Sequence, residues 1–347
     1  MIIQRVNVFP ILGIHFIQVA EQHLPSEAFF ATSIALVNTK FTHAWAISCL
    51  QLAIPTMDTT SKYTKNLWYS KNRKDLMKLF GRLKFYGIST KMIGPYLKSC
   101  AKTNKTDFEV IALLHDMIKK KKANSSPDEY HGRGAQRGKD VLALLNDSKI
   151  SKPKMYLDIG ASDGLITKAI GAALALPKSH IHAVDTERWI GQENKVDGEA
   201  KDDIHFSFIN MVDDKKPIIS YQDRSFDIIT VLQSLHHFEN LGPMMKEIQR
   251  LSTIGGTVII REHNADSKNT KMLIELEHLF YGFLCDGLSI DDFAKDYYGV
   301  YRSAKEWDVV FADHGFKCVH KKQKNNPTKY YYAVYVNVGF GIQKVQE

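Results

Sequence analysis

The chain has 347 residues, of which 44% are hydrophobic, and a formal net charge of +8 at pH 7. This length and apolar content are enough for one or two domains with a substantial core. The four cysteines (Cys49, Cys100, Cys285 and Cys318) are scattered, without a Cys-x-x-Cys pair or histidines at ligand spacing. Such cysteine usage argues against a disulfide scaffold and a zinc site, so we expect free thiols, no bound metal and a reducing, cytoplasmic compartment.

The first 60 residues are rich in apolar side chains but lack a clean span of about 20 of them, the length that crosses a membrane. Pro10, His15 and Gln18 interrupt residues 5–20, and polar residues between 38 and 43 interrupt residues 28–56. We expect packed helices in this region and no membrane association. A signal peptide over the first 20 residues is the less favoured alternative.

Positive charge is concentrated in residues 62–122, which hold 16 Lys and Arg against four acidic residues. This segment therefore carries +12, whereas the rest of the chain, with 30 basic and 34 acidic residues, carries −4. A basic segment beside a near-neutral remainder is typical of an arm that binds polyanions. We therefore expect RNA as a partner.

Six aromatic residues interleave with these basic side chains: Trp68, Tyr69, Phe80, Phe85, Tyr86 and Tyr96. Aromatic rings among lysines can stack on the bases of a single strand. The alternative is a helical core with a solvated basic face, since apolar residues recur at helical spacing from Leu76 to Leu83.

Lys119–Lys122 is followed by Ala-Asn-Ser-Ser-Pro-Asp, which is typical of a helix end and a linker. This composition predicts a mainly helical N-terminal region over residues 1–125 and a second domain over residues 126–347.

The second domain begins with a strand and a turn of small residues. An apolar run ends at Asp158, and a helical pattern starts at Leu165. This order predicts a buried strand, a tight turn and a helix N-terminus, where a nucleotide-like ligand binds in an open α/β sheet. The spacing Asp-x-Gly-x-Ser-x-Gly differs from the Gly-x-Gly-x-x-Gly of dinucleotide sites. Asp158 would repel a pyrophosphate and attract an ammonium or a sulfonium, so the turn favours a cationic ligand.

This pattern resembles motif I of the class I S-adenosylmethionine (SAM)-dependent methyltransferases. The resemblance implies that Asp158, Gly160, Ser162 and Gly164 bind SAM. Ser162 stands where the family usually has its middle glycine, and serine is small enough for us to interpret it as a tolerated variant. A purely structural turn at a strand–helix junction is the alternative for the motif taken alone.

Two further strands place polar residues at the same edge of the predicted sheet. One ends at Asp185, about 20 residues past the turn, the interval at which an acid accepts hydrogen bonds from ribose hydroxyls. The next ends before Asn210 and Met211. The resemblance implies that Asn210 contacts the adenine and that Met211 packs on it, although Asp213 and Asp214 could equally serve.

The most family-specific stretch is SFDIITVLQSLHHFEN with the later MMKEIQRLSTIGGTVIIRE, which is similar to the methyltransferase type 11 pattern. It predicts strands over residues 225–232 and 257–260 with a helix over 244–251 between them, and the resemblance implies that Gln233 lines the cofactor pocket. The last third resembles the helix, Gly-Phe turn and closing β-hairpin of such domains, with strands over 316–320 and 330–338.

The resemblance covers roughly residues 130–347. It implies an α/β fold, Rossmann-like and doubly wound, with a mostly parallel sheet and a C-terminal antiparallel hairpin. The mainly helical basic region would precede this domain.

Methyl transfer from a sulfonium is an in-line displacement that depends mainly on positioning, and a base is needed only when the nucleophile must lose a proton. Glu262, His263 and His236 lie at the carboxyl ends of predicted strands and are the candidate catalytic residues. The alternative is that the His236-His237 pair only closes over the cofactor.

Four residues are candidates for substrate binding: Arg133, Arg137, Tyr298 and Arg302. Arg133 and Arg137 come from a glycine-rich stretch that precedes the first strand, and this stretch is either a flexible entry to a helix or part of a lid. An arginine there could pair with the methionine carboxylate of SAM or with a substrate phosphate.

Three functions remain open. The leading one is a SAM-dependent methyltransferase of RNA, possibly cap-related, which uses the basic arm to hold the phosphate backbone. The second is methylation of a small-molecule or lipid-like acceptor, in which residues 280–288 and 297–301 wall an apolar pocket. The third is a catalytically silent nucleic-acid-binding protein that keeps the fold, although Asp158 and Asp185 speak against it.

Overall fold

The computed structural model describes residues 58–86, 88–120, 128–186, 204–212, 216–284, 289, 293 and 297–339. The helices expected before residue 57, the linker that follows Lys120, and Asp213 and Asp214 lie outside these residues. Among the described helices, none combines the length and the apolar character that crossing a membrane requires.

An eight-stranded sheet forms the centre of the second domain, in the order β4-β3-β2-β1-β5-β6-β8-β7. The strands are β1 (Tyr156–Ile159), β2 (Ile181–Asp185), β3 (His205–Val212), β4 (Lys216–Ile219), β5 (Phe226–Leu232), β6 (Ser252–His263), β7 (Phe316–Gln323) and β8 (Tyr330–Asn337). Strands β1, β2, β3, β5 and β6 are parallel, whereas β8 runs antiparallel to both β6 and β7. The mostly parallel sheet with a C-terminal antiparallel hairpin is therefore confirmed.

Strand β4 has no counterpart in the sequence analysis. It pairs antiparallel with β3 at the edge of the sheet and alternates exposed and buried residues. The sequence does not predict this strand because it begins with Lys216 and Pro217, and proline is depleted in strands. An edge strand tolerates proline because its backbone needs fewer ladder bonds.

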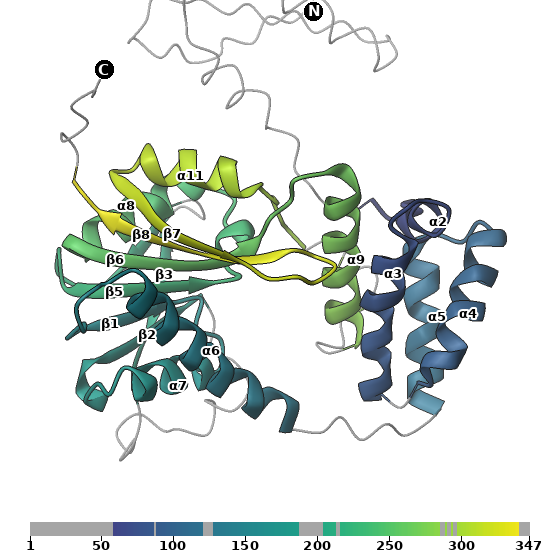
Figure 1. Cartoon of the computed structure of the whole chain (residues 1–347), viewed down its shortest axis with the longest axis horizontal. Helices are drawn as coiled ribbons and strands as arrows, with labels where there is room; N and C mark the ends of the chain where they lie inside the picture. The colour runs from purple at the N-terminus through teal and green to yellow at the C-terminus, as the bar shows by residue number, and fades with distance from the viewer. Residues whose placement is uncertain are drawn as a thin grey trace, which may run out of the picture. The chain divides into compact units, whose positions relative to one another are not determined.

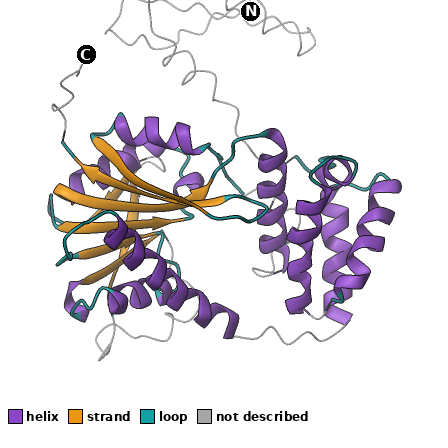
Figure 2. Ribbon diagram, viewed as in Figure 1, coloured by secondary structure: helices purple, strands orange, loops and turns teal. Residues whose placement is uncertain are grey.

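Helices cover both faces of the sheet because its strands alternate their side chains (Figure 2). Leu157 and Ile159 of β1 join the core that also holds α8 (Leu241–Leu251) and α11 (Ala304–Ala312). Tyr156, which precedes Leu157 in the strand, joins the opposite core with α6 (Asp128–Asp147) and α7 (Leu165–Ala173). The same alternation continues through β5, β6 and β8, so each strand contributes to two cores.

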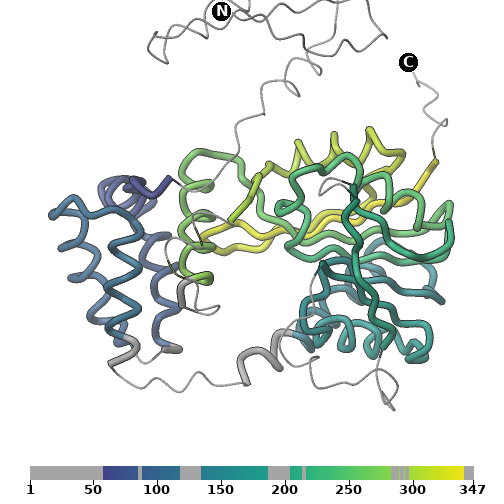
Figure 3. Tube along the Cα trace, turned by 180° about the vertical axis from the view of Figure 1, so that it is seen from behind, coloured from purple at the N-terminus to yellow at the C-terminus, as the bar shows by residue number. Residues whose placement is uncertain are grey.

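The basic region folds into helices that share a core with a helix of the predicted second domain, so the predicted boundary at residue 125 does not separate two independent cores. They are α2 (Tyr63–Trp68), α3 (Arg73–Phe80), η1 (Gly81–Tyr86), α4 (Thr90–Lys102) and α5 (Asp107–Lys120). Helix α9 (Lys268–Leu284), which follows β6 in the chain, lies beside them and contributes Leu273, Leu276 and Phe280 to their core (Figures 1 and 3). Arg82 forms an ion pair with the buried Glu277 of α9.

Most of the described aromatic side chains of the basic region belong to this core rather than to its surface. Trp68 and Phe80 are 5% and 0% exposed. Tyr96 packs on the same core and donates its hydroxyl proton to the Val110 carbonyl at 2.6 Å. The stacking prediction is therefore wrong for these three rings, because helical spacing directs them inward. Tyr69 is 64% exposed, and the side chains of Phe85 and Tyr86 lie outside the described part of the chain.

The glycine-rich stretch lies within helix α6. The sequence analysis had left open whether this stretch is a flexible entry to a helix. Its glycines allow close packing on α7. A Cβ at Gly138 would lie 2.7 Å from the backbone oxygen of Ala169, and one at Gly134 would lie 3.2 Å from the Ala169 Cβ. The small residues thus serve helix–helix contact rather than chain flexibility.

Gly138→Ala should lower the free energy of unfolding by about 1–2 kcal/mol, because the added methyl group forces the backbones of α6 and α7 apart. Gly81→Ala is the matched control, since a Cβ there has no neighbour within 4 Å and the residue has right-handed helical angles. It should raise stability by about 0.4–1 kcal/mol. Urea denaturation of both variants measures the difference, and a Gly138→Ala protein as stable as the parent would contradict the close packing.

Candidate active site

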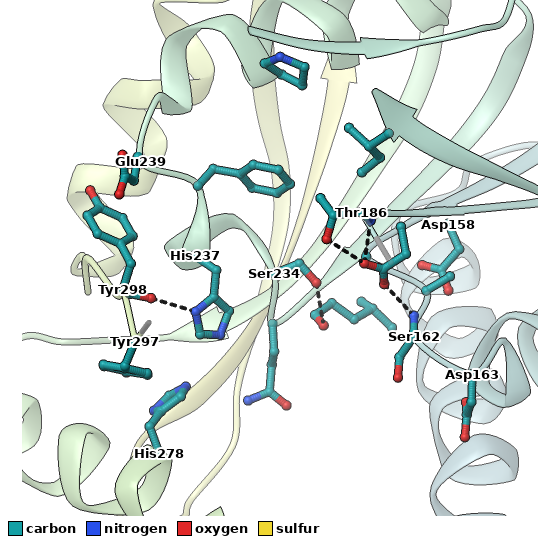
Figure 4. A pocket seen from close by; sticks show the side chains of 18 of the residues that line it. Asp158, Ser162, Asp163, Thr186, Ser234, His237, Glu239, His278, Tyr297 and Tyr298 are labelled. Carbon is teal, nitrogen blue, oxygen red and sulfur yellow. Dashed lines mark hydrogen bonds between the residues drawn. The ribbon is translucent and has the colours of Figure 1, made fainter. Parts of the chain in front are cut away.

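A cavity of about 760 Å³ opens at the carboxyl ends of the parallel strands. One end is lined by the turn after β1 and by the end of β2, including Asp158, Gly160, Ser162 and Asp185. In Figure 4, Asp158 and Ser162 face His237, His278, Tyr297 and Tyr298 across the cavity. Ligands of open α/β sheets bind at this edge, so the cavity is the candidate active site.

The turn after β1 has three residues in the left-handed region: Gly160 (φ 75°), Ser162 (φ 51°) and Gly164 (φ 74°). A Cβ at Gly160 would lie 2.2 Å from the Oγ of Ser234, so glycine is required there for space as well as for angle. Ser162 lines the cavity in a conformation that glycine adopts more readily. Gly164 begins α7 and is not among the described lining residues.

Asp158 is buried in β1 and lines the cavity. Its carboxylate accepts hydrogen bonds from the hydroxyls of Thr167 at 2.6 Å and Thr230 at 2.5 Å. Burial raises the pKa of Asp158 to about 6, even though these two bonds favour the carboxylate. A cationic ligand in the cavity would favour the ionised form further.

Asp185, at the end of β2, connects the two loops of this edge. Its Oδ2 accepts the backbone N–H of Ser162 at 2.7 Å, and its Oδ1 accepts that of Thr186 at 2.7 Å. The carboxylate is thereby fixed at the rim of the cavity, close to the turn after β1. Thr186, which the sequence analysis did not select, lines the cavity beside it.

The two residues of β3 that were predicted to contact the adenine, Asn210 and Met211, differ in whether they line the cavity. Ile209 and Met211 line the cavity, whereas Asn210 is exposed and is not among the described lining residues. Side chains alternate along a strand, so a residue between two lining residues points to the other face. Gln233, after β5, does line the cavity, and its backbone has a φ of 63°.

The far wall of the cavity comes from α9 and from the segment before α11. His278, Tyr281 and Gly282 are supplied by α9, and Phe293, Tyr297 and Tyr298 by the following segment. The rings of Phe293 and Tyr297 are stacked at 4.5 Å. Among the residues that wall an apolar pocket in the second functional hypothesis, the structure thus brings Tyr281, Gly282, Tyr297 and Tyr298 to the cavity.

Glu262, His263 and His236 are each 1% exposed and do not appear among the described lining residues. Glu262 accepts the backbone N–H of Leu235 at 3.0 Å, and its Oε2 is 2.6 Å from Nδ1 of His236. Burial raises the pKa of Glu262 to about 7 and, with Arg302 and Arg261 nearby, lowers the pKa of His236 to about 3. The three residues form a buried layer behind the cavity wall, and their catalytic role stays a prediction.

Two of the arginines predicted to bind substrate have partners within the protein. Arg137 lies 3.3 Å from the Tyr332 hydroxyl and 3.7 Å from the Asp140 carboxylate. Arg302 donates to the Val300 carbonyl at 3.3 Å. Neither arginine is among the described lining residues, and the side chain of Arg133 is outside the described part of the chain. Of the four candidates, Tyr298 lines the cavity.

The sequence analysis missed His278 and Phe293 as lining residues. His278 lies in the helical sequence Leu-Ile-Glu-Leu-Glu-His-Leu-Phe, where a single histidine among apolar residues gives no functional signal. Its position next to His237 depends on where α9 packs, which no local pattern encodes.

Asp158→Asn should stabilise the protein in a pH-dependent way. The folded pKa is raised above the unfolded value of about 4, so the parent loses stability as pH rises from about 4 to 6 and no further above 6. Asparagine removes this penalty, and the variant should gain up to about 3 kcal/mol relative to the parent at pH 7. Urea denaturation at several pH values measures the difference, and a gain that is the same at pH 4 and pH 7 would contradict a raised pKa.

Gly160→Ala should cost more stability than Gly255→Ala. Both residues have a φ near 75°, but a Cβ at Gly255 has no neighbour within 4 Å. Gly255→Ala therefore isolates the backbone strain of about 1–2 kcal/mol. Gly160→Ala adds the collision with Ser234, on the order of 1–3 kcal/mol. Thermal unfolding compares the two, and equal losses would show that the turn has room for a side chain.

Comparison with known proteins identifies the family. Residues 130–321, more than half of the chain, match a family model described as a methyltransferase domain. No curated protein matches the sequence.

Solved structures with a similar arrangement include three methyltransferases. A putative methyltransferase of Haloferax volcanii, in complex with a methyltransferase activator, is 13% identical over 60% of this chain and 95% of that chain, with a TM-score of 0.39. A SAM-dependent methyltransferase of Methanosarcina mazei is 15% identical over 56% and 97%, with a TM-score of 0.39. Magnesium protoporphyrin IX methyltransferase of Synechocystis with bound SAH is 16% identical over 58% and 83%, with a TM-score of 0.38. On the match over residues 130–321, the chain belongs to the class I SAM-dependent methyltransferases.

Proposed function

We propose that the protein methylates a small acceptor that has an apolar body. The observation that carries this proposal is a single cavity that runs from the turn after β1 to a wall of aromatic side chains from α9 and its following segment. An acceptor held between these two ends would be largely removed from water, as small-molecule sites require.

The end of the cavity at β1 and β2 fits SAM. Gly160 leaves room where a Cβ would collide with Ser234, and Asp158 offers a buried negative charge. Asp185 is held at the rim in a position suited to ribose hydroxyls. When bound, SAM supplies a methyl group that passes to the acceptor nucleophile as its S–C bond breaks, leaving a neutral thioether.

The opposite end would hold the acceptor. Phe293 and Tyr297 provide stacked rings, and Tyr298 adds a further ring. Rings favour flat or apolar ligands. His237 and His278 are the imidazoles of the described wall, and either can accept a hydrogen bond from an acceptor hydroxyl or thiol. By fixing the nucleophile in line with the methyl group, this wall would supply most of the rate enhancement.

RNA methylation, with a cap among the candidate acceptors, is the second candidate, and the charge of residues 62–122 favours it. Several lysines of this region are exposed, including Lys74, Lys84 and Lys98. However, its described rings are in the core except for Tyr69. The basic region would then bind the phosphate backbone without stacking, and binding should weaken steeply with salt.

Tyr298→Ala should raise the KM for the acceptor at least tenfold while the affinity for S-adenosylhomocysteine stays within twofold, because the variant removes a ring only from the acceptor end. Labelled methyl transfer from SAM into a small-molecule extract and into RNA identifies the acceptor class. Asp185→Ala, which alters the cofactor end, should weaken S-adenosylhomocysteine binding instead.

Tyr69→Ala is the matched control, since it removes an exposed ring of the basic region away from the cavity. It should leave transfer to small molecules unchanged. Label in RNA that is abolished by nuclease and falls steeply with added salt would refute the small-acceptor proposal in favour of RNA.

A further inference from the structure

A cluster of histidines lies where the turn η3 (Leu235–His237) meets α9. One ring nitrogen from each of His236, His237 and His278 lies within 4.8 Å of the other two. The Nε2 atoms of His236 and His278 are 3.2 Å apart, although the residues are 42 positions apart in the chain. We propose that these three imidazoles bind a divalent cation of the zinc type at the acceptor end of the cavity.

The orientation of each ring is fixed through its other nitrogen. His237 donates Nδ1–H to the Tyr298 carbonyl at 2.8 Å, and His278 donates Nδ1–H to the Ile274 carbonyl at 2.9 Å. A carbonyl can only accept, so Nε2 of both rings keeps its lone pair.

Nδ1 of His236 is 2.6 Å from the Glu262 carboxylate. Hydrogen bonds from Nδ1 to carbonyl and carboxylate oxygens are the usual second layer of a metal site, because they set the tautomer and the ring orientation.

When Glu262 is ionised it accepts Nδ1–H of His236, and the contact between His236 and His278 is then favourable only with a cation between its two nitrogens. With both Nδ1 atoms protonated, two lone pairs would face each other at 3.2 Å, which is repulsive. A shared proton or a metal ion removes this repulsion. A proton bridges two nitrogens only, whereas a metal ion uses a third donor, and His237 supplies one at the same point.

The distances suit tetrahedral coordination after a small adjustment. Zinc–nitrogen bonds of 2.0–2.1 Å place two ligand nitrogens roughly 3.3 Å apart. His236 and His278 already meet this separation, and since the three nitrogens lie within 4.8 Å of one another, His237 has to approach by at most about 1.5 Å. His237 is the exposed member of the three, so its ring is the one with room to move.

The surroundings support a metal ion of this type. Imidazole donors suit zinc and other late first-row metals, whereas magnesium and calcium prefer oxygen. Glu262 brings a carboxylate next to His236 and offsets the nearby Arg261 and Arg302. His263, whose ring is 5.4 Å from that of His278, has a buried Nε2 without a partner among the described residues.

His237 and His278 line the cavity, so the fourth coordination position would face the acceptor. The metal would bind an acceptor oxygen or sulfur and lower its pKa, which favours attack on the methyl group. This role rests on the proposed function, but the site itself does not.

The test is metal binding by the full chain without an affinity tag, after chelation and dialysis. Addition of Co²⁺ should give the intense visible absorption bands of a tetrahedral site, and one equivalent of Zn²⁺ should displace them. His237→Ala, at an exposed position, should retain the fold and bind Zn²⁺ at least tenfold more weakly. His278→Ala should abolish the bands, and Glu262→Gln should weaken Zn²⁺ binding by about 10–100-fold.

His314→Ala is the matched control. Like His278, His314 donates Nδ1–H to the carbonyl oxygen four residues earlier, here that of Val310 at 2.7 Å, but it lies outside the cluster. It should bind both metals like the parent. Absence of stoichiometric binding by the parent, or binding unchanged in both His237→Ala and His278→Ala, would overturn the proposal. S-adenosylhomocysteine binding, measured on each variant, separates loss of the metal site from loss of the methyltransferase fold.

Discussion

The two-sided packing of α9 is the constraint on which the cavity depends. Residues on one side of this helix, including Leu276 and Phe280, complete the core of the basic region. His278 lies at the cavity instead. The ion pair of Arg82 with Glu277 joins the two regions at a buried position, and removal of either partner would leave an uncompensated charge there. The basic region therefore packs against the helix that forms one wall of the cavity.

The edge of the sheet concentrates conformational strain and charge at the other end of the cavity. Gly160, Ser162 and Gly164 are all left-handed, and Gln233, which follows the neighbouring strand β5, is left-handed as well. Asp158 stays buried although burial raises its pKa to about 6. Such costs persist where the surrounding structure fixes them, and they are concentrated at functional sites. Both features lie at the cavity, as expected of a site in which backbone and charge approach a ligand.

The histidines connect the strands to α9. His236 is in contact with Glu262 of β6 through one nitrogen and with His278 through the other. A substitution in β6 that moves Glu262 would therefore shift His236 and, through it, the cavity-lining His278, without contact between β6 and a ligand. Both oxygens of Glu262 are engaged, one by the backbone N–H of Leu235 and the other by His236.

The sequence by itself determined the parallel sheet, its strand order along the chain, the closing hairpin and the turn after β1. These features depend on local patterns, namely apolar runs, small residues and acids at strand ends, and such patterns persist whatever packs around them. Tertiary structure alone decided that Trp68 and Phe80 face a core shared with α9, that Asn210 points away from the cavity, and that His278 meets His236 and His237. Each of these depends on the relative placement of distant segments, which is set by side-chain packing between elements rather than by the pattern within one.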